Sequence, residues 1–130
     1  MSHIVTVRTQ VRDPLALAAA CRRLGLAVPS IGSAVLFSGS AEGHRVQLPG
    51  WRYPVVFNTT TGESRYDNYG GQWGDPRMLN QLLQFYAVEK ATLEAHRQGH
   101  TLTEHRLAEG SIKLVIRDTG SGESVKGGAL

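Results

Sequence analysis

The chain has 130 residues, of which 41% are hydrophobic and 19% charged, a composition typical of one ordinary globular domain and not of a disordered protein. Its net charge of +3 and its pI of about 9.4 by themselves suggest nucleic acid as a partner. The arginines are scattered, however, with Arg22–Arg23 as the longest basic run, whereas phosphate binding requires charges gathered on one face. We therefore expect no nucleic-acid partner.

Three further features bear on the compartment. No apolar run approaches the ~20 residues that a membrane helix needs, and the segment that starts at Met1 lacks the charged and apolar regions of a secretory signal. The single Cys21 has no partner for an internal disulfide, as is usual in a reducing compartment. These features predict a soluble cytoplasmic protein with no membrane association.

The first half of the chain predicts a strand, a helix and a series of hairpins. Residues 3–11 alternate β-branched and polar side chains, which indicates a strand. Asp13-Pro14 then starts a helix that Gly25 ends. Short apolar runs separated by turn residues predict an antiparallel meander. Its strands are expected at residues 34–38, 44–48, 54–58 and 64–68, with a break at 29–33 and hairpin turns at 39–43 and 60–63.

The second half predicts a long helix and a final pair of strands. Asp75-Pro76 opens a helix from Arg77 to about Gln98, which Gly99 ends, and strands follow at 101–107 and 111–117. Residues 118–130 are rich in Gly and Ser and predict a flexible tail after a single domain of residues 1–117. The order β-α-β-β-β-β-α-β-β predicts an α+β fold, a two-layer sandwich in which one antiparallel sheet of six or seven strands carries two helices on one face.

Familiar catalytic and cofactor motifs are absent from the sequence, which has no GxGxxG, P-loop, HExxH, CxxC or GxSxG. The histidines His96, His100 and His105 are spaced like metal ligands, but Gly99 should end the helix among them and no Cys or acidic residue completes a tetrahedral set. We expect neither a metal nor a cofactor. Cys21 lies on the apolar stripe of its helix, which favours a core residue over a nucleophile.

The stretch from Leu48 to Asp75 is the most distinctive part of the sequence, because it holds both tryptophans, three of the four tyrosines and five glycines. A hairpin between its two strands would place residues 51–53 and 69–73 at the same open end. The candidate binding or interface residues are Trp51, Arg52, Tyr53, Asp67, Asn68, Tyr69, Gly70, Gly71 and Trp73.

Three interpretations of this stretch are open at the level of sequence. The rings can form a structural cluster that fixes a long loop, with Arg52 stacked on a ring and paired with Asp67. They can instead form a surface for a protein partner. As a third interpretation, Arg52, Asp67 and Asn68 can act with the rings as a small-ligand or catalytic site.

Four segments of the chain, MSHIVTVRTQVRDP, VQLPGWRYPVVF, YDNYGGQWGD and GSIKLVIR, resemble a family of uncharacterised proteins from bacteria, cyanobacteria and algal plastids, known as a conserved plastid reading frame. The resemblance covers about residues 1–117 and brings no catalytic residues. It implies an accessory or adaptor subunit associated with an AAA-type ATPase system. The leading hypothesis is a non-enzymatic interaction protein that uses the loop 48–75 toward a protein partner or toward itself in an oligomer.

Overall fold

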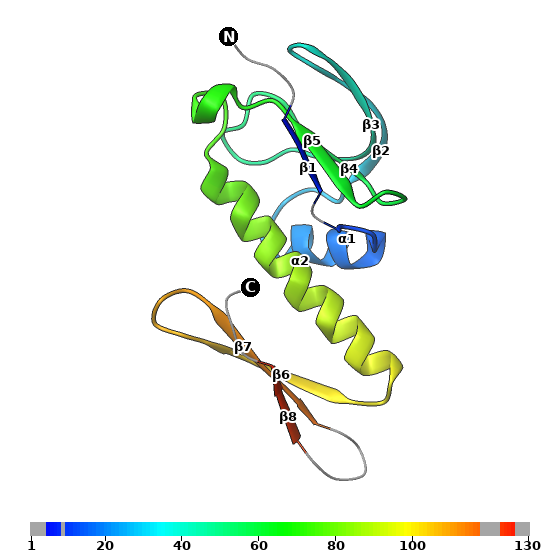
Figure 1. Cartoon of the computed structure of the whole chain (residues 1–130), viewed down its shortest axis with the longest axis vertical. Coiled ribbons are helices and arrows are strands. Elements are labelled where there is room, and N and C mark those ends of the chain that lie inside the picture. Colours follow the sequence, from blue (N-terminus) through cyan, green and yellow to red (C-terminus); the bar gives the residue numbers. More distant parts are fainter. Residues whose placement is uncertain (1–4, 9, 118–122, 127–130) are drawn as a thin grey trace.

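The structure is a computed structural model that describes residues 5–8, 10–117 and 123–126 (Figure 1). Its elements are β1 (Val5–Arg8), α1 (Pro14–Arg23), β2 (Ser30–Leu36), β3 (Gly39–Val46), β4 (Val55–Asn58), β5 (Glu63–Tyr66), the 3-10 turn η1 (Tyr69–Gly71), α2 (Pro76–Arg97), β6 (Thr101–Arg106), β7 (Ile112–Arg117) and β8 (Glu123–Lys126). Two antiparallel sheets form, one in the order β1-β5-β4-β3-β2 and the other in the order β6-β7-β8.

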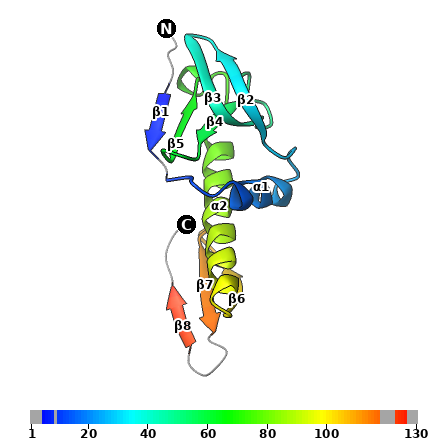
Figure 2. The ribbon, with the colours of Figure 1, turned by 90° about the vertical axis from the view of Figure 1, so that its right-hand side faces the viewer.

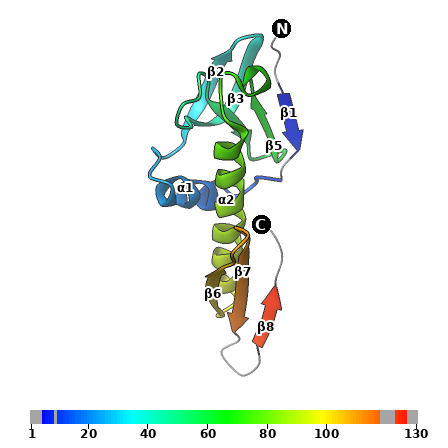
Figure 3. The same ribbon diagram turned by 90° about the vertical axis from the view of Figure 1, so that its left-hand side faces the viewer.

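The α+β class is as the sequence predicts, but the single sheet of six or seven strands is wrong. Figure 1 shows the five-stranded sheet near the start of α2, and Figure 3 shows β6 and β7 beside the other end of that helix. Because α2 has 22 residues, it carries the chain about 33 Å from the first sheet. Among the described strands, β6, β7 and β8 therefore pair with one another and not with the first sheet. The order also gains β8, inside the segment expected to be a tail; residues 118–122 and 127–130 of that segment lie outside the described residues.

Both helices begin as the Asp-Pro pairs predict. The Asp13 carboxylate accepts hydrogen bonds from the amides of Leu15 and Ala16, at 2.9 and 3.2 Å, and Asp75 accepts one from the amide of Arg77 at 3.0 Å. These bonds satisfy amides that have no partner within the helix. In the described part of the chain, neither helix is both long and apolar enough to cross a membrane.

The main hydrophobic core lies between the two helices and one face of the five-stranded sheet, and it continues to β7. Val46 pairs with Val55 in the sheet, and Phe57 lies two residues further along the same strand, so the three side chains share this face. The buried residues of the core include Leu17, Cys21, Val46, Leu48, Trp51, Val55, Phe57, Leu82, Phe85, Tyr86, Ile112 and Leu114.

Polar contacts join α1 to α2 at the edge of this core. Lys90 on α2 donates to the Asp13 carboxylate at 3.2 Å, and the Tyr86 hydroxyl accepts from the amide of Asp13 at 3.1 Å. Burial acts to raise the pKa of Asp13, but the bonds from the Ala16 and Leu15 amides and from Lys90 outweigh it and hold that pKa below its usual value. The Asp13 carboxylate is therefore stabilised in its charged form.

The β2–β3 hairpin differs from the prediction. The turn is at residues 37–38, and the expected turn at 39–43 is part of β3, whereas β2 begins inside the expected break. Gly43 does not serve a turn: a Cβ there would lie 2.4 Å from the carbonyl oxygen of Phe57. This glycine allows β4 to approach β3 closely, which a sequence pattern cannot distinguish from a turn signal.

Candidate functional site

The loop 48–75 sends its two tryptophans in different directions. Trp51 is only 5% exposed and belongs to the main core. Trp73 is half-buried and meets other rings near the tip of the β2–β3 hairpin. The aromatic stretch therefore consists of two structures with different surroundings.

Trp51 fixes the loop to the start of α2. Its indole Nε1 donates to the carbonyl of Asp75 at 3.1 Å, and its ring meets Tyr66 edge to face, with centroids 5.5 Å apart and planes at 70°. Gly74 lies directly against the indole, because a Cβ built there would be 2.3 Å from Cδ2 of Trp51. Trp51 thus fits the interpretation of a structural cluster.

Trp73 is the centre of a cluster at the surface. Its ring stacks on Tyr69 with centroids 4.7 Å apart and meets Phe37 and Tyr53 edge to face, at 5.2 and 5.8 Å. The guanidinium carbon of Arg52 lies 4.7 Å from the centroid of the Trp73 ring, within the range of a cation–π contact. We call these five residues the Trp73 cluster.

Backbone hydrogen bonds set the positions of the cluster residues. The amide of Arg52 donates to the carbonyl of Trp73 at 2.8 Å. The carbonyl of Asn68 accepts from the amides of Gly71 and Trp73, at 3.0 and 2.9 Å, and its side-chain amide donates to the carbonyl of Gly74 at 3.3 Å. Asn68 is a positioning residue beneath the cluster and not part of its exposed surface.

A run of left-handed backbone aims the Tyr69 ring at Trp73. The φ angles of Tyr69, Gly70 and Gly71 are 48°, 63° and 101°. Glycine adopts such angles readily, but a residue with a Cβ is strained there by roughly 1–3 kcal/mol. Gly70 and Gly71 allow the sharp turn, and Tyr69 is held in its strained conformation with its ring stacked on Trp73.

The three polar residues of the ligand-site interpretation do not share one surface. Arg52 is exposed, whereas Asp67 is 0% exposed and Asn68 is buried. In the part of the chain that the structure describes, the Arg52 guanidinium lies over the rings of Trp73 and Tyr53 and forms no ion pair with Asp67. The expected Arg52–Asp67 pair is therefore not formed.

Sequence reasoning missed one member of the cluster, Phe37. It is 56% exposed and follows β2 at the hairpin turn, far from the loop 48–75 in the sequence. The only signal was a large apolar residue beside the turn residues Ser38 and Gly39. The contact with Trp73 depends on how the hairpin curves, which no local pattern specifies.

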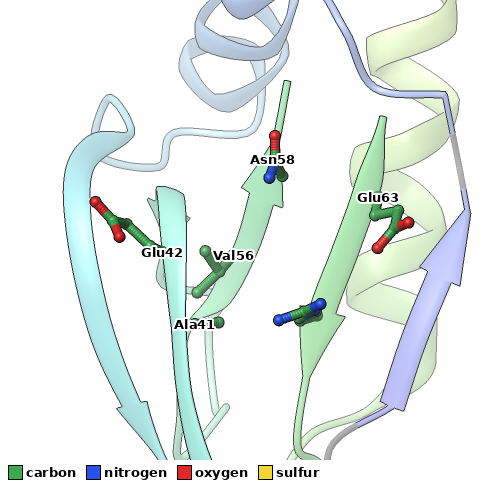
Figure 4. Close-up of a pocket in the computed structure, with 6 residues that line it drawn as sticks. Ala41, Glu42, Val56, Asn58 and Glu63 are labelled. Atoms are coloured by element: carbon green, nitrogen blue, oxygen red, sulfur yellow. The ribbon is translucent and has the colours of Figure 1, made fainter. Parts of the chain in front are cut away.

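A cavity of about 170 Å³ opens on the sheet between β3, β4 and β5, away from the Trp73 cluster. Figure 4 shows Glu42 and Glu63 on opposite sides of it, with Ala41 and Val56 between them. Small-molecule sites usually measure ~300–1,000 Å³ and are mostly apolar. This cavity is smaller, and charged side chains of both signs, Glu42, Glu63 and Arg65, line it, so it does not match the size or the apolar lining of a typical metabolite site.

The described histidines and Cys21 do not form a metal site. Within the described residues no three His, Cys, Asp or Glu side chains gather closely enough to hold a metal ion. Cys21 is wholly buried in the core, and burial raises the pKa of its thiol to about 11. Since the thiolate is the reactive form, Cys21 is not a nucleophile at neutral pH.

The Trp73 cluster is thus the candidate functional site. It combines four rings and a guanidinium at the surface, held by the backbone bonds of the loop. Comparisons with models of protein families, with curated proteins and with solved structures find no match to this chain.

Proposed function

We propose that this protein is a non-enzymatic accessory protein that binds a protein partner through the Trp73 cluster. The observation that supports the proposal is the difference between the two tryptophans: the core needs Trp51, whereas Trp73 stays half-exposed among Phe37, Tyr53 and Tyr69. Trp, Tyr and Arg are the residues that dominate the binding energy of protein interfaces. This cluster brings all three types together at the surface.

The rigidity of the cluster favours binding. Its rings already contact one another and its backbone is hydrogen-bonded, so few side chains must be ordered when a partner arrives. Backbone strain of the kind seen at Tyr69 persists where the surrounding structure enforces it, and it concentrates at functional sites.

The chemistry of the cluster indicates the kind of surface that a partner would present. Arg52 supplies its only formal charge, in a planar group that binds carboxylates through two hydrogen bonds. The partner would therefore offer an acidic side chain beside apolar groups. The resemblance to the plastid reading-frame family adds a class of partner, an AAA-type ATPase system in which this chain would act as an adaptor or assembly subunit.

Affinity purification from the native organism tests this proposal with variants that leave the fold intact. Tyr69→Gly removes a ring and at the same time relieves the strained backbone, so its stability should stay within about 1 kcal/mol of the wild type. Arg52→Glu reverses the exposed charge. Arg22→Glu is the matched control, because Arg22 is an exposed arginine on α1. Circular dichroism verifies the fold of each variant.

We expect the wild type and Arg22→Glu to retain the same partner. The amount of that partner recovered with each of the two cluster variants, measured by mass spectrometry, should be at least tenfold lower. Retention of every partner by Tyr69→Gly and Arg52→Glu would refute the proposal. A ligand site at Arg52, Asp67 and Asn68 is not proposed, because Asp67 and Asn68 are buried.

A further inference from the structure

The strand β2 lies at an open edge of the five-stranded sheet. It pairs with β3 on one side, and no described strand pairs with its other side (Figure 2). The backbone groups of an edge strand are a template for pairing with another chain, so natural proteins protect such edges with charges, proline or bulges. β2 has seven residues, and none of them is charged or proline.

The composition around β2 extends this observation. Residues 24–41 contain no charged residue and no histidine. Ile31 and Val35 lie on the same face of β2 as Ser33, and they are 75% and 78% exposed. Ala34 and Leu36, on the opposite face, are buried. Exposed β-branched side chains on an edge strand without charged residues of its own are typical of a strand that acquires a neighbour.

The sequence of β2 identifies that neighbour, because the strand is complementary to itself. In an antiparallel pair centred on Ser33, Ile31 lies opposite Val35 of the second copy, and Gly32 lies opposite Ala34. Both pairs match in size and in charge, and the central residues are small enough for close approach. Beyond Leu36, Phe37 would face Pro29, which lacks the amide that a longer ladder requires.

We infer that two copies of this protein pair through β2, antiparallel and centred on Ser33, to form a two-fold dimer with one continuous ten-stranded sheet. Such an interface uses the same patch on both copies, as two-fold symmetry demands. It goes beyond the proposed function, because Ile31, Ser33 and Val35 lie outside the Trp73 cluster.

Two charged residues of β3 lie beside β2: Glu42, which pairs with Ser33, and Arg45. The Arg45 guanidinium donates to the Ser30 hydroxyl at 3.2 Å and to the Ser33 carbonyl at 3.1 Å, and it passes over Gly32, where a Cβ would be 3.2 Å from Cζ. Pairing about Ser33 brings the two Arg45 side chains together on one face of the sheet and the two Glu42 side chains together on the other, and the bond from Arg45 to the Ser33 carbonyl lies at the centre of the pair. Salt screens the repulsion between like charges on each face, so the dimer should strengthen from 0.05 to 0.5 M NaCl.

Sedimentation of the full chain between 1 and 100 μM tests the inference. The wild type should sediment as a dimer, and Val35→Lys should raise the dissociation constant at least tenfold. Leu15→Lys, an equal charge added at an exposed leucine on α1, should leave it unchanged. A monomer throughout this range, or a Val35→Lys protein that dimerises like the wild type, would overturn the inference.

Disulfide trapping tests the register. Residues opposite each other across an antiparallel pair have Cα atoms about 4.5–5.5 Å apart, within reach of a disulfide. Ser33→Cys should therefore form an intermolecular disulfide under mild oxidation. Ser40 is exposed but lies on β3, one strand away from the edge, so Ser40→Cys should not form this disulfide. The native Cys21 is buried and does not compete. Equal cross-linking of both variants, or open aggregates instead of dimers, would refute the Ser33-centred pair.

Discussion

Replacement of Gly74 by alanine is the sharpest test of how the loop 48–75 is built. Gly74 is buried, and its Cβ would lie 2.3, 2.6 and 2.7 Å from three atoms of the Trp51 indole. Carbon atoms in good contact are ~3.5–4.0 Å apart, so one of the two groups must move by more than 1 Å. The indole is held by its bond to Asp75 and by Tyr66.

The expected cost follows from this geometry. Overpacking of a well-filled site costs about 1–3 kcal/mol in the free energy of unfolding. Removal of the indole by Trp51→Ala costs about 3–5 kcal/mol. Once the indole is absent, Gly74→Ala has nothing to clash with, and its backbone effect should be neutral or stabilising by ~0.4–1 kcal/mol. The two substitutions should therefore be coupled by about 1–4 kcal/mol.

Urea denaturation of the four proteins of this double-mutant cycle, followed by far-ultraviolet circular dichroism, measures the coupling. The dependence of unfolding free energy on urea should be the same for all four, so that differences in midpoint report stability. If Gly74→Ala costs the same with and without the indole, the close approach to Trp51 is not the reason for a glycine at this position.

Three further predictions concern other parts of the core and loop. Asp13→Ala should lower the free energy of unfolding by about 1–2 kcal/mol, because the helix cap and the contact with Lys90 are lost. Folding lowers the pKa of Asp13 below its ordinary 3.8, so the stability that Asp13 contributes is present above that pH and is lost as the pH falls below it. The urea midpoints of the wild type and Asp13→Ala should therefore converge in acid. Cys21 should react with a thiol reagent at pH 7.5 far more slowly in the native protein than in urea, since it is buried and its pKa is raised to about 11; equal rates would contradict its burial. Gly50→Ala should cost about 1–2 kcal/mol from backbone strain alone, because φ is 75° and nothing lies within 4 Å of the new methyl group; urea denaturation measures it, and no loss would contradict the strain.

The helices could be predicted from the sequence because their signals are local. Asp13-Pro14 and Asp75-Pro76 place cap and first-turn residues next to each other, and Gly25 and Gly99 follow the ends with φ angles of 73° and 76°. The division into two sheets was not predictable in this way. The division depends on the position of the C-terminal end of α2, and the alternation of residues within a strand does not indicate which other strands lie close enough to pair with it.

Of the candidate residues named from the sequence, Arg52, Tyr53, Tyr69 and Trp73 lie in the Trp73 cluster, whereas Trp51, Asp67 and Asn68 are buried. Trp51 and Trp73 have the same side chain, lie in the same loop and have glycines nearby. Their surroundings differ. In the core, Trp51 packs against Gly74 and donates a hydrogen bond to the carbonyl of Asp75. Outside the core, Trp73 contacts Phe37, which comes from the β2–β3 hairpin. Contacts between segments far apart in the chain separate the two tryptophans, and such contacts leave no periodic pattern.

Phe37 links the two proposed surfaces and determines how they would act together. Phe37 contacts Trp73. It lies four residues beyond Ser33, and Ser33 lies on the proposed two-fold axis. The two Phe37 residues of a dimer would therefore be eight residues apart along the paired strands, a distance of about 27 Å. Each cluster would remain open, and a partner with two acidic, apolar sites at that spacing would bind both at once. Val35→Lys would then weaken capture by a multivalent partner while its affinity for a single site stayed unchanged, because the second binding event would no longer be intramolecular. A loss of single-site affinity in Val35→Lys would show instead that the β2 edge itself contacts the partner.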